Sequence, residues 1–161
     1  MRKKIKPQVI ISWLGVIIWM TVIFVFSAQD ATESSGTSTE FTVRILKVFI
    51  SSVSHTDIHF MAETLDFAVR KLAHFGVYFV LGILVRNAFS YCNVRRKSGL
   101  SAVLCLAYSI TDEVHQLFVP GRACRIFDVV IDTAGGISGI LIYVLIVCVF
   151  MQKINNRQSC K

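Results

Sequence analysis

Charged residues are scarce in this sequence. Only 17% of the 161 residues are Asp, Glu, Lys or Arg, against roughly 25% in ordinary soluble domains. Hydrophobic residues make up 54% of the chain, and its mean hydropathy is +0.62. A soluble core of this size has no room for so much apolar surface. The composition excludes an ordinary soluble domain and predicts a single integral membrane domain over residues 1–161.

The motifs of common cofactor-binding proteins are also missing. The sequence contains no Cys-x-x-Cys pair, no P-loop and no glycine-rich dinucleotide fingerprint. No spacing of its His, Cys, Asp and Glu residues matches a known metal-site signature. We therefore expect neither a cofactor nor a metal ion.

The sequence has instead four long apolar runs, at residues 9–26, 72–89, 99–119 and 127–151. A membrane-spanning helix needs about 20 mostly apolar residues, because the hydrocarbon core is about 30 Å thick. The runs predict an all-α fold, an integral membrane four-helix bundle. The first run follows basic residues, as a signal peptide does, but it is longer than the usual apolar region of about 7–15 residues. An uncleaved membrane anchor is therefore the favoured interpretation.

The distribution of charge predicts how these spans are oriented. If the N-terminus is cytoplasmic, the cytoplasmic segments contain ten of the seventeen Lys and Arg residues and none of the ten acidic residues. Cytoplasmic loops of membrane proteins are rich in Lys and Arg, so we expect both termini to be cytoplasmic. The net charge of +7 then reflects topology and contact with anionic lipids rather than nucleic-acid binding.

Residues 27–71 form the one sizeable segment expected outside the membrane. Within it, residues 40–53 place apolar side chains on one helical face and Arg44 and Lys47 opposite, which predicts an outer amphipathic helix after the first span. The alternative is a helix packed on the outer ends of the spans. From Asp57 onward no glycine or proline precedes the second span, so that span is expected to begin as a helix well above the membrane.

Polar residues gather at the outer ends of the second and fourth spans. Residues four apart share a helix face, so Arg70 and His74 lie together on the second span. On the fourth span, Asp128, Asp132 and Gly139 fall on one stripe. Glycines on such a stripe let a neighbouring helix approach closely.

The third span carries the densest polar segment. Asp112 lies on the same face as His115 and Gln116, whereas Glu113 points about 100° away. Ionisable side chains within a membrane are costly and usually mark a functional site. We predict that these residues converge with those of the other spans on one outward-facing charged pocket. The predicted binding residues are Arg70, Lys71, His74, Asp112, Glu113, Gln116, Arg122, Asp128 and Asp132, and the candidate catalytic residues are His74, Asp112, Glu113, His115 and Asp132.

These residues fall in blocks that resemble the VanZ-like family. The blocks are Phe26-Ser27-Ala28-Gln29, Arg70-Lys71-Leu72-Ala73-His74-Phe75, Asp112-Glu113-Val114-His115-Gln116 through Pro120-Gly121-Arg122, and Asp128 through Asp132 to Gly135-Gly136. The Asp-Glu-x-His-Gln block that ends in Pro-Gly-Arg is quite specific. The resemblance implies a small multi-pass protein of the bacterial cell membrane. The family takes its name from an accessory protein of glycopeptide-antibiotic resistance associated with teicoplanin, and the resemblance specifies no reaction.

Three mechanisms fit the charged pocket, and a purely structural ion-pair network is the alternative to all of them. In the first, which we favour, the basic residues bind the anionic head group of a lipid, a cell-wall precursor or a lipid-tailed glycopeptide. In the second, a membrane-embedded hydrolase or transferase uses His74 or His115 as general acid or base beside a carboxylate. In the third, His and carboxylates relay protons for transport, which requires a homo-oligomer. The sequence leaves open whether the protein is an enzyme.

Overall fold

The structure, a computed structural model, describes residues 6–29, 55–122 and 124–159. Its helices within these ranges are α1 (Pro7–Ser27), α3 (His55–Ser90), α4 (Lys97–Gln116) and α5 (Ile126–Ser159), and these ranges contain no strand. The predicted all-α fold is therefore confirmed. The amphipathic helix predicted at residues 40–53 lies outside the described residues.

The local sequence explains where the helices begin and end. Pro7 occupies the start of α1, because the fixed φ of proline suits the first helical turn. α3 already begins at His55, so it includes the extension predicted above the second span. α4 ends at Gln116, three residues before the predicted limit. It stops there because Pro120 follows closely and disfavours helix in the residue before it, and Gly121 turns the chain with a φ of 72°.

Three of the helices contain stretches long and apolar enough to cross a membrane. These are Pro7–Ser27, Ala68–Ser90 and Ile126–Lys153, with mean hydropathies of 2.6, 1.6 and 2.4. Among the described helices α4 falls short of this threshold, since its last two turns carry Asp112, Glu113, His115 and Gln116. It nevertheless packs against α3 and α5. The fold is thus a membrane helical bundle, and the cytoplasmic position of both termini stays a prediction.

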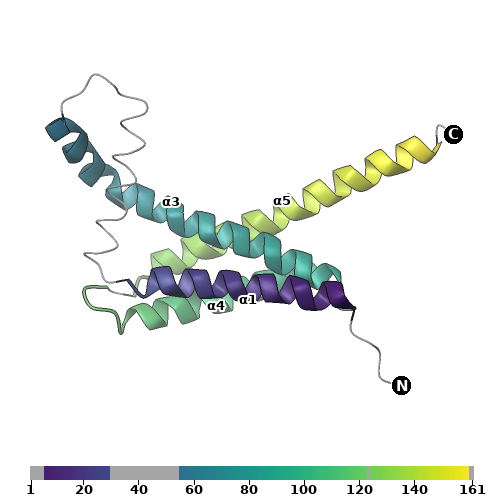
Figure 1. The fold of residues 1–161 in the computed structure, drawn as a ribbon, viewed down its shortest axis with the longest axis horizontal. Helices are drawn as coiled ribbons and strands as arrows, with labels where there is room; N and C mark the ends of the chain where they lie inside the picture. The colour runs from purple at the N-terminus through teal and green to yellow at the C-terminus, as the bar shows by residue number, and fades with distance from the viewer. Residues whose placement is uncertain (1–5, 30–54, 123, 160–161) are drawn as a thin grey trace.

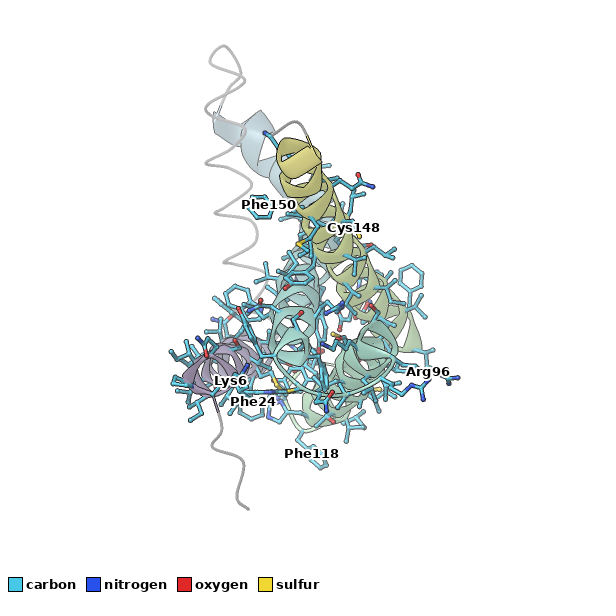
Figure 2. All side chains as sticks on the ribbon, turned by 90° about the vertical axis from the view of Figure 1, so that its right-hand side faces the viewer. Lys6, Phe24, Arg96, Phe118, Cys148 and Phe150 are labelled. Carbon is cyan, nitrogen blue, oxygen red and sulfur yellow. The ribbon has the colours of Figure 1, made fainter. Side chains whose placement is uncertain are left out.

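α3 is the central helix of the bundle, because its contacts with α1, α4 and α5 are together the most extensive of any helix. Figure 1 shows α3 and α5 crossing obliquely, with α1 and α4 along one side. The second half of α5 continues beyond the other helices. Figure 2 shows Cys148 and Phe150 on this projecting half, away from α1 and α4. Both side chains are exposed.

Glycines allow α3 and α5 to meet backbone to backbone where they cross. A Cβ atom added to Gly139 would overlap the carbonyl oxygen of Phe79, and one added to Gly82 would overlap that of Gly136. Small residues at such crossings let helices approach closely. The stripe predicted on α5 therefore faces α3, and Asp132, one turn before these glycines, is fully buried there.

α1 is attached to the bundle by one narrow face. Its buried residues are Val16, Ile23 and Ser27. The indole Nε1 of Trp19 donates a hydrogen bond to the carbonyl oxygen of Val77 at 2.8 Å, which ties α1 to α3. Apolar residues on the outer face, such as Ile11, are exposed. In a membrane this face contacts lipid tails, which are as apolar as the side chains themselves.

The helices alternate in direction, so the bundle has two chemically different ends (Figure 1). The carboxylate end holds the last turns of α1 and α4, residues 117–122 and 124–125, and the first turns of α5. The basic end holds the first turn of α1 and residues 91–96, which connect α3 to α4. No acidic residue occurs in residues 67–111 or 133–161, so the basic end contains none.

Replacing Gly139 with alanine is expected to lower the melting temperature of the protein, because a Cβ has no room beside the backbone of Phe79. Overpacking of this kind costs about 1–3 kcal/mol. Thermal unfolding in detergent measures the effect. Gly15→Ala is the matched control, because nothing lies within 4 Å of a Cβ at that position in α1. If Gly139→Ala melts like the wild type, α3 and α5 do not cross as closely as described.

Candidate functional site

The carboxylate end gathers four buried acidic side chains from two helices. Asp112 and Glu113 come from the last two turns of α4, and Asp128 and Asp132 from the first two turns of α5. We call these four residues the carboxylate cluster. Their exposed fractions lie between 0% and 6%, which is unusual because buried carboxylates require partners. α3 and the α4–α5 connection supply most of those partners.

Asp132 is the point where three helices meet. Its Oδ1 lies 3.3 Å from Nδ1 of His74 on α3, an ion pair when the imidazole is protonated. Its Oδ2 accepts a hydrogen bond of 3.2 Å from the hydroxyl of Ser109 on α4. The carboxylate thus fixes the orientation of the His74 ring, as an acid–base pair requires.

Lys71 and Asp128 form a second link between α3 and α5. The Nζ of Lys71 donates to Oδ1 of Asp128, and both side chains are largely buried. Asp128 lies in the first turn of α5, where the helix dipole favours negative charge. Breaking one partner of such a pair leaves the other charge buried without compensation.

Asp112 and Gln116 join α4 to α1. The Nε2 of Gln116 donates to the hydroxyl of Ser27 at 3.1 Å and approaches Oδ2 of Asp112 at 3.5 Å. The end of α1 is therefore one wall of the candidate site.

Glu113 contacts a different part of the protein from Asp112, as expected from the angle of about 100° between the two side chains on the helix. Its Oε2 accepts a hydrogen bond of 2.8 Å from the backbone N–H of Arg125. This bond anchors the connection between α4 and α5, which holds Arg122 over the cluster. The side chain of Arg125 itself is exposed.

Arg122 lies among charges of both signs. Its own partial burial lowers the pKa of its guanidinium, and so does the nearby charge of Arg70, whereas Asp112 and Glu113 act in the opposite direction. The two arginines are therefore close enough to repel each other. The Nε of Arg122 is buried and has no hydrogen-bond acceptor among the described residues.

Two carboxylate oxygens of the cluster have no hydrogen-bond donor within the described part of the chain. They are Oδ1 of Asp112 and Oε1 of Glu113, whereas Oδ1 of Asp132 faces His74. No three His, Cys, Asp or Glu side chains in the same ranges are arranged to hold a metal ion. The arrangement therefore offers a guanidinium and these acceptors to a polar ligand.

The two histidines proposed as catalytic candidates have different surroundings. His74 lies against Asp132. His115 packs instead against Phe24 of α1, with ring centroids 4.3 Å apart and the ring planes tilted by 40°. Helical spacing predicted that His115 lies beside Asp112, but the contact of His115 that the structure shows is with the aromatic ring of Phe24. Of the two, only His74 is oriented by a carboxylate in the described part of the chain.

Sequence reasoning did not include three neutral residues of the site among the predicted site residues. Ser109 is buried and donates to Asp132, and Ser27 is buried and accepts a hydrogen bond from Gln116. Tyr78 is fully buried and near enough to Asp112 and Asp132 to feel their charges. Its position on the face of Arg70 and His74 was visible in the sequence. For Ser27 the one available signal was its place in the Phe-Ser-x-Gln block, and Ser109 had none.

Comparison with known proteins identifies the family. The family model described as VanZ/LLP1 matches residues 12–147, which cover all of the cluster and its partners. No curated protein and no solved structure matches the chain. Because the family model spans most of the sequence, the chain belongs to the VanZ/LLP1 family.

Proposed function

We propose that this protein binds the anionic head group of a lipid-linked ligand at its carboxylate end. The observation that carries this proposal is the position of Arg122. Its Nε is buried with no acceptor among the described residues, and the charge of Arg70 lies close by. An oxyanion between the two guanidinium groups would relieve their repulsion and supply the missing acceptor.

The carboxylates suit the rest of such a ligand. Asp112 and Glu113 each keep one buried oxygen without a hydrogen-bond donor from the described residues. Those oxygens can accept hydroxyl or amide N–H groups, as on a sugar, glycerol or peptide attached to the anion. The opposite charges also keep the site near neutrality, which matters because an uncompensated charge within a membrane is costly.

The proposed ligands follow from where the site lies in the membrane. The basic end is proposed to face the cytoplasm, in keeping with the excess of Lys and Arg in cytoplasmic loops. The carboxylate end of this multi-pass protein then faces outward from the bacterial plasma membrane. Ligands available there are a phospholipid, a cell-wall precursor or a lipid-tailed glycopeptide. If the ligand is a lipid-tailed glycopeptide, the protein would contribute to teicoplanin resistance.

A second candidate function is acid–base catalysis on the same ligand. The specific observation is the buried Asp132, which holds His74 at 3.3 Å while Ser109 donates to its other oxygen. A histidine oriented by a carboxylate can donate or accept a proton near neutral pH. The protein would then be a hydrolase or transferase of a lipid-linked group.

Replacing both Arg70 and Arg122 with alanine is expected to weaken ligand binding by at least about tenfold, since hydrogen bonds between charged groups contribute roughly 1.5–3 kcal/mol. Native mass spectrometry in mild detergent, with added phosphatidylglycerol and lipid-linked cell-wall precursor, measures the binding. Arg95→Ala at the basic end is the matched control. Melting temperatures show whether each variant is folded. Unchanged retention of both probes in the folded double variant contradicts the proposal.

If the site is catalytic, His74→Gln is expected to reduce turnover of a labelled lipid-linked precursor by about 10²–10⁴-fold, the usual contribution of a general acid or base. His115→Gln should retain turnover, because the His115 ring packs against Phe24 and is not oriented by a carboxylate of the described residues. Thin-layer separation of the labelled products measures both. Absence of turnover by the wild type leaves binding as the function. Equal losses in the two variants exclude the proposed role of His74.

A further inference from the structure

A second polar network lies at the basic end, far from the carboxylate cluster. Its centre is Arg86, one turn before the end of α3. Nη1 of Arg86 donates to the hydroxyl of Ser90 at 2.8 Å, and Nε donates to the hydroxyl of Ser98 on α4 at 3.1 Å. The guanidinium also lies over the ring of Tyr143 on α5, 5.4 Å from its centroid. Arg86 thus connects three helices.

The hydroxyl of Tyr143 extends this network. It donates to Oδ1 of Asn87 at 3.1 Å and lies 3.2 Å from the hydroxyl of Ser90. These contacts fix the ring beneath Arg86. An arginine near a membrane surface ordinarily extends its charged head into water. Arg86 is instead half-buried and held in one orientation by neutral groups.

Lys97 brings a second positive charge to the same place. Its Nζ donates to the backbone carbonyl oxygen of Ser90 at 2.9 Å, so Lys97 and Arg86 converge on one residue. Lys97 is also the first residue of α4, and the first turn of this helix contains no acidic residue. A helix N-terminus carries partial positive charge, which adds to that of the two side chains.

This concentration of positive charge has no compensating carboxylate. The full sequence places no Asp or Glu between residues 67 and 111 or after residue 132. The cations of the network donate to hydroxyls and a carbonyl, which do not neutralise them. Two cations held side by side next to a helix N-terminus favour an anion.

We propose that Arg86 and Lys97, together with Ser98, form a site for the phosphate group of an anionic phospholipid. The oriented guanidinium suits a phosphate oxygen pair, and the ammonium of Lys97 adds a point charge. The apolar outer faces of the helices provide the surface for the acyl chains. A free phosphate has the same chemistry, so the experiment includes both. The proposal is independent of the function proposed for the carboxylate end.

Replacing Arg86 and Lys97 with glutamine is expected to weaken phosphatidylglycerol binding about fivefold for each charge removed. Native mass spectrometry, with phosphatidylglycerol or phosphatidylcholine titrated into detergent-solubilised protein, gives the dissociation constants. Arg95→Gln removes an exposed charge from the neighbouring loop and should have little effect. Arg86→Lys keeps the charge but loses the planar guanidinium, and should bind with intermediate affinity. Inorganic phosphate, added as a competitor, should displace the lipid poorly.

These titrations distinguish a built phospholipid site from diffuse positive charge on the basic end. Equal binding of the two lipids by the wild type overturns the proposal, and so does an equal loss in Arg95→Gln, which would indicate diffuse charge. Full displacement by inorganic phosphate also overturns it, because the site would then bind the free anion rather than the lipid. Because both lipids are titrated into every variant, the preference for phosphatidylglycerol over phosphatidylcholine is measured within each variant, and a general loss of stability does not imitate a loss of that preference. The variant of Arg70 and Arg122 should keep this lipid preference whether or not it binds a ligand at the carboxylate end.

Discussion

The backbone contact between α3 and α5 is the constraint on which the rest of the structure depends. Gly82, Gly135 and Gly139 remove the side chains that would separate the two helices. The same contact sets the register of α5, so that Asp132 meets His74. A slip of one helical turn moves a residue about 5.4 Å along the axis, which would break this pairing. The glycines therefore position the charged site without touching it.

Structural and functional roles are divided among the charged residues of the carboxylate end. The pair of Lys71 and Asp128 joins two helices, and Glu113 holds the connection that carries Arg122. These contacts already pair the carboxylates of Asp128 and Glu113 with donors from the protein. Under the proposed function, Arg122, Oδ1 of Asp112 and Oε1 of Glu113 remain for a ligand. Different atoms would then stabilise the bundle and bind the ligand.

The sequence predicted the helices well, because long apolar runs are local signals. It also predicted the stripe of Asp128, Asp132 and glycines, since helical periodicity fixes which residues share a face. Periodicity does not say which face meets which neighbour. For that reason the sequence could not decide whether His74 or His115 lies against a carboxylate. Neutral partners such as Ser109 were not recognised, because the search for site residues relied on charged side chains.

The projecting half of α5 has a consequence for how the protein lies in a bilayer. The apolar stretch of 28 residues in α5 is about 42 Å long at 1.5 Å per residue, whereas the hydrocarbon core measures about 30 Å. α1, with 21 residues, needs almost no inclination to match that thickness. A helix longer than the hydrocarbon core is accommodated by tilting, by kinking or by local thickening of the bilayer, and the oblique crossing of α5 in Figure 1 corresponds to tilting. Bilayer thickness therefore acts on the angle at which α5 passes α3, and through that angle on the spacing of the charges at its first turns.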